Sequence, residues 1–319
     1  MNKLLLLGLI SILAVTLVTP HATFAKSKAD KKAEKSIDKA IGRAVEGKYS
    51  TIKMVNISTF ALANSTITVV NRTEGGNVPP PPPPNPTPTP QPSNGFKLCM
   101  AGDFKDSKVF DAMKKNGCNY RIALGDMGYA SDLKLVKSIK PDRAVCGNHD
   151  MAEDGSAAIE KECLAFAGNS WWQKIGNKTL ILGFNTNTDI KPQLDAAKKL
   201  LFDNQFMSDV KNVIALSHKN GHVFPSAHHP AEASALYSQL ESNMPQGVTL
   251  YEVGAHNHDS AQGGNWFIAG GGGKSFYACG KDTIWTFCDN SHVAYLQFTI
   301  DNQGQITPNF LDTSNKVIH

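Results

Sequence analysis

A dense proline run divides this chain into parts that cannot share one hydrophobic core. Ten of the fourteen residues from 79 to 92 are proline. Proline lacks a backbone N–H and fixes φ, so such a run adopts extended polyproline II and excludes packed helix or sheet. We therefore interpret residues 79–94 as a linker, whose proline-rich part would extend over roughly 43 Å. Residues 95–319 remain as the predicted working domain.

The residues before the linker begin with the pattern of an export signal. Lys3 precedes fifteen uncharged residues from Leu4 to Val18, and Ala25 ends the segment. We predict a signal peptide over residues 1–25, cleaved after Ala25. A helix over the uncharged run would reach about 22 Å, short of the hydrocarbon layer of a bilayer, so a stable transmembrane span is not expected. An uncleaved N-terminal anchor is the alternative.

Residues 26–78 form a short segment to which the sequence assigns no role. Residues 26–48 carry eight Lys or Arg against four Asp or Glu, which is typical of a solvated helix, with weak association to a surface as the alternative. Residues 51–73 are rich in Thr, Val, Ile and Asn and could pair as strands. They are too few to build an independent core.

The composition places the working domain among globular proteins. Of the 319 residues, 41% are hydrophobic and 19% are charged, which excludes a mainly disordered, collagen-like or polytopic membrane protein. The formal net charge of +4 is too small to indicate a nucleic-acid partner. Export would allow the six cysteines to form disulfides. Their pairing stays open, with Cys279 to Cys288 preferred because the two are close in the chain and flank a predicted loop.

Residues 95–319 alternate short apolar runs with amphipathic segments, an order typical of an α/β fold. We expect strands at 97–101, 120–124, 143–146, 180–184, 213–216, 249–253, 266–269 and 293–300. Apolar residues recur at helical spacing elsewhere. They predict helices near 106–117, 133–139, 156–168 and 196–207.

Five polar clusters follow five of these apolar runs. They are Gly102-Asp103, Gly125-Asp126, Gly147-Asn148-His149-Asp150, Ser217-His218 and His256-Asn257-His258. In α/β sheets the ligand crevice lies beyond the carboxyl ends of the strands, so the clusters are predicted to converge. His256 and His258, two apart on an expected strand, would face the same side.

The converging side chains are suitable donors for metal ions. Carboxylate and amide oxygens and imidazole nitrogens suit divalent and trivalent first-row metals, and the clusters contain no cysteine for a thiolate zinc site. The donors exceed the needs of one tetrahedral ion. They suit two ions about 3.5 to 4 Å apart bridged by a carboxylate, an arrangement used for in-line attack on phosphorus.

Each cluster also has an ordinary structural explanation. A Gly-Asp pair after a strand is most often a turn or a helix cap, and His218 alone could be a hydrogen-bonded core histidine. The string from Gly147 to Asp150 is the most specific element, because chance would produce such a string in well under about one chain in a hundred. The occurrence of all five clusters in order favours a functional site.

The ordered series resembles the calcineurin-like metallophosphoesterases, whose pattern runs Asp, Gly-Asp, Gly-Asn-His-Asp/Glu, His and His-x-His. The resemblance covers nearly all of residues 97–270 and implies a four-layer α/β/β/α sandwich. Most members carry Asp-x-His in the first cluster, whereas residues 103–105 here are Asp-Phe-Lys. Residues 125–129, Gly-Asp-Met-Gly-Tyr, match the Gly-Asp-x-x-Tyr of the purple acid phosphatases, in which the tyrosine binds a ferric ion.

Two departures set this chain apart from the purple acid phosphatases. Gly-Asp-Phe-Lys stands in place of Gly-Asp-x-Gly in the first cluster, and Ala255 replaces the glycine that usually precedes the first histidine of His-x-His. The working domain also lacks an obvious separate N-terminal β-sandwich. The resemblance therefore indicates a distant relative.

The resemblance implies two overlapping ligand sets that share the bridging carboxylate of Asp126. The first set is Asp103, Asp126, Tyr129 and His258, and the second is Asp126, Asn148, His218 and His256. An ordinary buried role for Tyr129 is the alternative. The resemblance implies that His149 is catalytic, stabilising the oxyanion or protonating the leaving oxygen, with a supporting hydrogen bond to Asp150 or to a ligand as the alternative.

By this resemblance we expect an exported, acid-phosphatase-like enzyme that hydrolyses phosphomonoesters with a metal-bound hydroxide and is secreted or lies at the cell surface. The implied cofactors are two metal ions, Fe(III) with a divalent Fe, Zn or Mn ion. The implied partner is a small phosphoester, with no nucleic acid beyond a nucleotide substrate. One alternative is a phosphodiesterase or nucleotidase on the same site. The other is a non-catalytic, metal-stabilised surface-binding module.

Neighbouring polar and glycine residues stay outside the predicted site. Lys219, Asn220 and His222 follow His218, and His228 and His229 lie in the next loop. All five could contact substrate. Gly270–Gly273 is predicted to be a tight loop beside the site rather than a phosphate-binding loop, because it lacks the Lys-Ser/Thr placement and the helix of a P-loop.

Overall fold

The computed structural model describes residues 95–129, 132–152, 154–224, 227–280 and 284–319. The predicted signal peptide, the segment 26–78 and the linker 79–94 lie outside the described residues.

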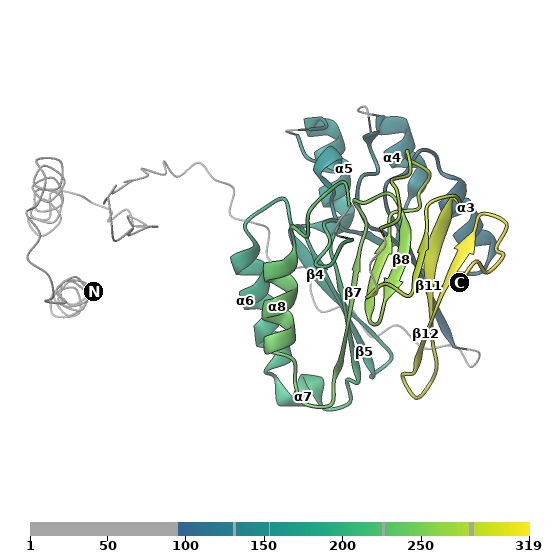
Figure 1. Cartoon of the computed structure of the whole chain (residues 1–319). Coiled ribbons are helices and arrows are strands. Elements are labelled where there is room, and N and C mark those ends of the chain that lie inside the picture. The colour runs from purple at the N-terminus through teal and green to yellow at the C-terminus, as the bar shows by residue number, and fades with distance from the viewer. Residues whose placement is uncertain (1–94, 130–131, 153, 225–226, 281–283) are drawn as a thin grey trace, which may run out of the picture. The chain divides into compact units, whose positions relative to one another are not determined.

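The described residues build two β-sheets flanked by helices (Figure 1). The five-stranded sheet has the order β12 (Ile306–Asp312), β11 (Ala294–Ile300), β1 (Phe96–Ala101), β2 (Tyr120–Ala123) and β3 (Arg143–Ala144). The seven-stranded sheet has the order β10 (Phe287–Asp289), β8 (Ser260–Gly263), β9 (Trp266–Ala269), β7 (Thr249–Gly254), β6 (Asn212–Leu216), β5 (Thr179–Phe184) and β4 (Ser170–Ile175). The helices are α3 (Lys108–Lys115), α4 (Leu133–Ile139), α5 (Ala157–Ala167), α6 (Ile190–Leu201), α7 (Asn204–Met207) and α8 (Ser234–Ser242), with a short 3-10 turn at Asn148–Asp150.

The alternation of side chains along each strand explains how the sheets pack. In β1, Leu98 and Met100 belong to a core that includes Ile181 and Ile214 of the other sheet. Successive side chains of a strand point to opposite faces, so Cys99 packs on the other side, in the cluster of α3, α4 and α5. Each fully buried Leu or Ile side chain contributes about 1.5 to 3 kcal/mol, so this shared core fixes the two sheets against each other.

The seven-stranded sheet follows the same rule on its outer face. Leu180 and Leu182 of β5 pack with Leu194 of α6 and Leu240 of α8, while Ile181 between them faces the core between the sheets. Helices α6 and α8 lie on one side of the sheets in Figure 1, and α3 lies on the other.

The α/β class expected from the sequence is confirmed, although several elements differ from their predicted form. The predicted helix 196–207 is two helices, α6 and α7, and α6 begins earlier, at Ile190, where the side chain of Asp189 accepts a hydrogen bond from Lys191 N. The strand predicted at 143–146 is only two residues long. Pattern reasoning missed β4, β8, β10, β12 and α8.

Three disulfides join all six cysteines. The preferred pair, Cys279 and Cys288, is confirmed. Cys99 of β1 joins Cys118 before β2, and Cys146 after β3 joins Cys163 of α5. The Cys146–Cys163 bond ties the loop that begins at Gly147 to α5, a helix on the outer face of the five-stranded sheet.

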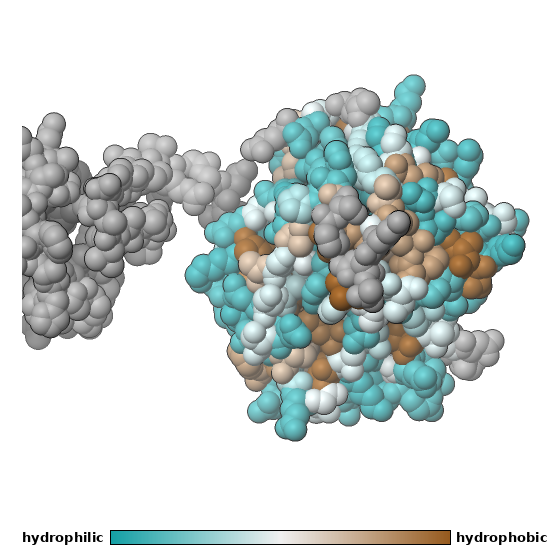
Figure 2. Space-filling model, viewed as in Figure 1, coloured by the Kyte–Doolittle hydropathy of each residue, from teal (hydrophilic) through white to brown (hydrophobic). Residues whose placement is uncertain are grey.

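The described part of the chain contains no helix that is long and apolar enough to cross a membrane. The face drawn in Figure 2 is mostly hydrophilic, with scattered hydrophobic patches. Phe202, Ile284 and Val317 are the large apolar side chains exposed among the described residues. Single exposed apolar side chains of this kind are normal for a folded domain.

Candidate metal centre

The five polar clusters lie where parallel strands of both sheets end. Asp103 follows β1, Asp126 follows β2 and Asn148 follows β3, and these three strands pair in parallel. His218 follows β6 and the segment 256–258 follows β7, which are parallel neighbours in the other sheet. Because the two sheets share one core, the structure brings together the side chains that the sequence placed at strand ends.

Two side chains contact the hydroxyl of Tyr129. This oxygen lies 3.1 Å from Asp103 Oδ1 and 2.7 Å from His258 Nε2. His258 Nε2 and Asp103 Oδ1 are themselves 3.5 Å apart. We call Asp103, Tyr129 and His258 the Tyr129 group.

A second set of donors also adjoins Asp126. His218 Nε2 is 3.3 Å from Asp126 Oδ1 and 3.1 Å from His256 Nδ1. Asn148 precedes His149, whose backbone N–H donates to Asp126 Oδ1 at 3.0 Å. We call Asn148, His218 and His256 the Asn148 group.

Asp126 belongs to two clusters that could each hold a metal ion. In one, donor atoms of Asp126, His218 and His256 all lie within 4.8 Å of one another, and in the other, those of Asp103, Asp126 and His258 do so. All five side chains are buried. A carboxylate shared in this way is the geometry expected of a bridging ligand.

Two histidines are held with one ring nitrogen facing the site. His218 Nδ1 lies 2.7 Å from the carbonyl oxygen of Leu124, and His258 Nδ1 lies 2.7 Å from that of Ser275. A carbonyl can only accept a hydrogen bond, so in each ring Nδ1 donates and Nε2 is directed towards the carboxylates. This second hydrogen bond is the usual device that orients a metal-binding histidine.

The backbone is strained at four of the predicted ligands. Asp103, Asp126, His256 and His258 have φ values of 63°, 52°, 68° and 53°, in the left-handed region that non-glycine residues seldom adopt. Such conformations cluster at functional sites because the surrounding structure must enforce them. They also correct one expectation: His256 and His258 lie in a loop beyond β7, not on a strand, so the left-handed backbone, not strand alternation, directs their rings.

The pKa values of the site reflect burial and close opposite charges. Burial raises the pKa of Asp103 to about 8, against the charge of His218 and with the help of Asp126. Burial also acts to raise the pKa of Asp126, but His218 outweighs it and holds that pKa below the usual value. Burial acts to lower the pKa of His218, yet attraction to Asp126 raises it to about 9.

The remaining two histidines are neutral near pH 7. Burial is the main cause that lowers the pKa of His256 to about 2 and that of His258 to about 4. A neutral imidazole keeps a lone pair for a metal ion. Metal binding requires deprotonated ligands, so a cation would displace the protons that Asp103 and His218 hold.

Among the predicted ligands in the described residues, two buried polar atoms have no hydrogen-bond partner: Asn148 Oδ1 and His256 Nε2. Asn148 Nδ2 donates to Asp154 Oδ2 at 3.2 Å, which leaves the side-chain oxygen of Asn148 available to bind a metal ion. The described residues also supply no Lys or Arg partner to Asp103 or Asp126. Their cationic partner is the buried His218, which is itself a predicted ligand. Metal cations could replace the charge of its proton, so the two buried carboxylates and the unpartnered Asn148 oxygen fit a pair of metal cations.

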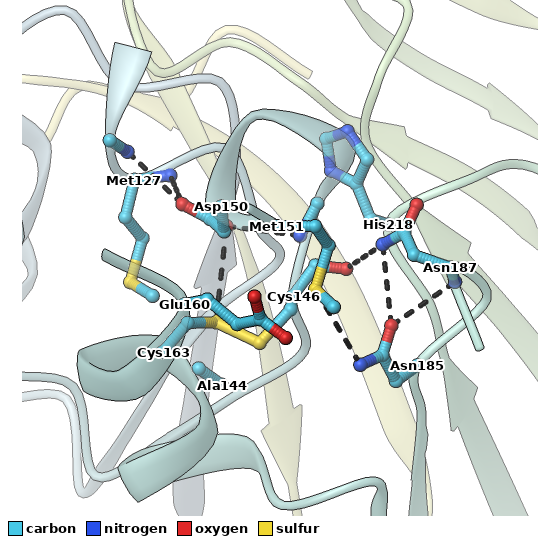
Figure 3. Close-up of a disulfide and its surroundings, with 12 residues drawn as sticks. Met127, Ala144, Cys146, Asp150, Met151, Glu160, Cys163, Asn185, Asn187 and His218 are labelled. Carbon is cyan, nitrogen blue, oxygen red and sulfur yellow. Dashed lines mark hydrogen bonds between the residues drawn. A yellow bond between two sulfur atoms is a disulfide. The ribbon is translucent and has the colours of Figure 1, made fainter. Parts of the chain in front are cut away.

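Asp150 supports the site without facing it. Its carboxylate accepts hydrogen bonds from the backbone N–H groups of Met127 (2.8 Å), Gly128 (3.1 Å) and Gly147 (3.0 Å), which joins the loops after β2 and β3. Figure 3 shows this carboxylate beside the disulfide of Cys146 and Cys163. A supporting bond from His149 to Asp150, the alternative considered for His149, is not among the contacts of Asp150.

Gly147 lies where the two loops touch. A Cβ added at Gly147 would fall on the carboxylate of Asp126, so only glycine allows this close approach. The next residues, Asn148 and His149, are thereby held beside Asp126. His149 Nε2 lies 4.0 Å from Asp126 Oδ2, and its side chain is 39% exposed.

Sequence reasoning missed three side chains near the site. Lys274 and Tyr277 follow β9, a strand that runs parallel to β7, and Glu232 lies between the site histidines in the chain. Tyr277 stacks on His258 with ring centroids 4.5 Å apart. The strand-end rule, extended beyond the glycine run that follows 266–269, would have pointed to the loop that carries Lys274 and Tyr277.

Glu232 belongs to a third group of donors, with His229 and His256. Glu232 Oε1 lies 3.4 Å from His256 Nε2, and Glu232 also pairs with Lys219. The rings of His229 and His256 are stacked, with centroids 3.7 Å apart and an interplanar angle of 29°. Lone pairs in nearly parallel ring planes do not converge on one ion, so this group lacks the geometry of the other two.

Comparisons with known proteins identify distant structures and no close relative. The sequence matches no protein-family model and no curated protein. One similar solved structure is that of GAP50 of Plasmodium, described as the anchor in the inner membrane complex, with 12% identity and a TM-score of 0.48 over 70% of this chain and 87% of that one. Another is YfcE, a phosphoesterase from E. coli, with 17% identity and a TM-score of 0.34 over 70% of this chain and 97% of that one. At these values neither likeness assigns an activity, so function has to be inferred from the side chains of the site.

Proposed function

We propose that this protein is a binuclear metal-dependent phosphoesterase that hydrolyses phosphomonoesters. The observation that carries the proposal is the shared position of Asp126 in two clusters of buried donors. Single structural metal sites are closed by four ligands around one ion. Two clusters joined by a carboxylate instead suit a pair of ions that act together on a phosphoryl group.

The proposed ligands divide between the two groups already described. Asp103, Tyr129 and His258 would hold one cation, Asn148, His218 and His256 the other, and Asp126 would bridge them. When bound, two cations lower the pKa of a water molecule towards about 7 and offset the negative charge of the phosphoryl oxygens. This fit rests on the unpartnered donor atoms, the strained backbone and the orientation of the histidines.

His149 is placed for proton transfer or charge stabilisation. Its ring packs against that of Tyr129, with centroids 4.6 Å apart, and it is partly open to solvent. Its backbone N–H is fixed by Asp126 Oδ1. A histidine held beside the bridging carboxylate and still accessible to substrate can stabilise the phosphoryl oxygens or protonate the leaving oxygen.

The finer features of the proposal concern the family, the metals and the location. We infer the α/β/β/α layering of the calcineurin-like phosphoesterases, with helices on the outer face of each packed sheet, and a purple-acid-phosphatase-like ferric ion bound to Tyr129 beside a divalent Fe, Zn or Mn ion. Contact of the Tyr129 hydroxyl with Asp103 and His258 supports that role. Three disulfides support export to a secreted or cell-surface location.

Metal analysis combined with an ester panel tests this function. The purified full chain is reconstituted with iron, zinc or manganese, its metal content is measured, and turnover of phosphomonoesters and phosphodiesters is compared. We expect two metal ions per chain and turnover mainly of monoesters. Two bound ions without turnover of any ester would favour the non-catalytic module, and a preference for diesters or nucleotides would favour the alternative hydrolases.

A further inference from the structure

Lys274 places a positive charge beside the candidate metal centre. Its Nζ lies 4.2 Å from the centroid of the Tyr129 ring, and the hydroxyl of that ring contacts Asp103 and His258. The side chain is partly buried. No carboxylate of the described residues lies within ion-pair distance of this ammonium group, in contrast to Lys219, which pairs with Glu232.

The backbone that carries Lys274 is fixed to the loop that carries Asp103. Lys274 N donates to Asp103 O at 3.1 Å, Gly272 N donates to Gly102 O at 3.0 Å, and Lys105 N donates to Gly272 O at 3.1 Å. A Cβ at Gly272 would collide with the carbonyl oxygen of Gly102. The glycine run is therefore a tight connection between two loops of the site, as predicted, and it sets the position of Lys274.

The Tyr129 ring contacts both His149 and Lys274. His149 packs against its ring with centroids 4.6 Å apart, and Lys274 lies over the ring as well. Both side chains therefore lie beside a ring whose hydroxyl contacts Asp103 and His258. A partly buried ammonium to which the described residues supply no counter-ion gains stability when an anion reaches it.

We propose that Lys274 recognises the second negative charge of a phosphomonoester and so determines specificity for monoesters over diesters. This inference rests on the proposed function. A monoester dianion has three non-bridging oxygens and two negative charges, whereas a diester has two such oxygens and one charge. Two cations would neutralise part of the charge of either ester. The extra charge and oxygen of the monoester then require a further donor, and an ammonium point charge suits a phosphate oxygen.

The experiment compares two variants that remove the same charge from neighbouring loops. Lys274→Met removes the ammonium over Tyr129. Lys105→Met removes an exposed ammonium from the loop that is hydrogen-bonded to Gly272. Each full-length, metal-reconstituted protein is assayed on 4-nitrophenyl phosphate and bis(4-nitrophenyl) phosphate. The pH is kept well above about 6, so that the monoester is a dianion.

We expect Lys274→Met to raise KM for the monoester about tenfold, the effect of losing one charge-assisted hydrogen bond. KM for the diester should change less than about twofold, because the diester lacks the charge that Lys274 recognises. Lys274→Arg should restore most of the monoester affinity, and Lys105→Met should leave both KM values unchanged. Equal losses on the two esters, a loss confined to kcat, or reduced metal content would overturn the proposal.

Phosphate binding tests Lys274 independently of turnover. Inorganic phosphate is titrated calorimetrically into the metal-loaded wild type and the same variants. If the wild type hydrolyses neither ester, the proposed function fails, but about tenfold weaker phosphate binding by Lys274→Met alone would still support the recognition role. Phosphate binding that is absent from the wild type, or equal in all variants, would refute it.

Discussion

The Tyr129 group and the Asn148 group differ in how many of their metal-ligand atoms already have a hydrogen-bond partner in the protein. In the Tyr129 group the phenol oxygen contacts both Asp103 and His258, and Asp103 Oδ2 accepts a hydrogen bond from His256 N at 2.8 Å. In the Asn148 group, Asn148 Oδ1 and His256 Nε2 have no hydrogen-bond partner among the described residues, although Glu232 Oε1 lies 3.4 Å from His256 Nε2. The Tyr129 group is therefore braced by its own hydrogen bonds, whereas the Asn148 group includes a buried oxygen, that of Asn148, which no hydrogen bond of the described residues satisfies.

This difference leads us to expect unequal metal sites. Preorganised donors bind without further ordering of side chains, so the Tyr129 group should retain its ion more firmly. Loss of one donor should matter less there, because the others stay fixed by protein contacts. The Asn148 group should lose its ion first when a donor is removed or its supporting loop is loosened.

The largest effect is expected from Asp126→Asn, because both groups depend on this carboxylate. We expect loss of both ions, and a fall in kcat/KM of at least about 10³-fold, since the bridging charge and its electrostatic effect disappear together. Metal analysis and ester turnover measure this directly. Asp111→Asn, an exposed carboxylate on α3, is the matched control. Retention of both ions in Asp126→Asn would show that the two groups are independent.

Removal of one donor from each group compares them directly. Asn148→Ala should lower affinity for one ion by at least about tenfold, because its unpartnered oxygen has no substitute in the protein. Tyr129→Phe should keep two ions per chain, since Asp103 and His258 remain held by His256 N and Ser275 O. If the first ion is Fe(III), however, the visible charge-transfer band of the wild type should disappear.

Metal content and visible spectra of the two variants decide the comparison. Loss of an ion from Tyr129→Phe with full occupancy in Asn148→Ala would reverse the ranking of the two groups. An unchanged band in Tyr129→Phe would reject tyrosine as the ferric ligand.

Protons should leave the site as cations enter it. The pKa values of about 8 for Asp103 and about 9 for His218 are raised, so both groups are largely protonated at pH 7. Metal binding needs both deprotonated, so apparent affinity should rise with pH and level off above the two pKa values, by about tenfold per pH unit for each proton released. Calorimetric titrations in two buffers of different ionisation enthalpy measure the proton release. Proton uptake, or affinity that falls as pH rises through this range, would contradict the assignment.

The smallest effect on the site is expected from the disulfide that supports the Asn148 group. Cys146→Ser with Cys163→Ser and Cys99→Ser with Cys118→Ser open loops of similar sequence separation, 17 and 19. Each pair should lower the free energy of unfolding by about 3 kcal/mol. Only the Cys146→Ser and Cys163→Ser pair should also weaken metal binding, because Cys146 adjoins Gly147 and the loop that carries Asn148. Denaturant unfolding and metal affinity measure the two effects, and equal weakening of metal binding by both pairs would count against a local role.

Local patterns were sufficient for elements whose residues carry strong signals. The apolar run of β9, Trp266–Ala269, was predicted with its observed bounds, and α4 was predicted over Leu133–Ile139. The missed strand β12 contains Pro308 and lies at the edge of its sheet, and its sequence is less apolar than that of the central strands. The missed helix α8 follows Ala233, which offers no side-chain hydrogen bond to mark its start.

The sequence by itself determined the donor types, their order and their positions at strand ends, because these depend on short motifs such as Gly147-Asn148-His149-Asp150. Only the tertiary structure decided which donors share a cluster, since the five strands belong to two sheets whose packing is a long-range property. It also decided the left-handed backbone of Asp103, Asp126, His256 and His258, a conformation that Asp and His adopt only in a minority of cases and that the surrounding structure must enforce. The place of Lys274 over Tyr129 has the same origin, because hydrogen bonds between loops some 170 residues apart in the chain hold it there.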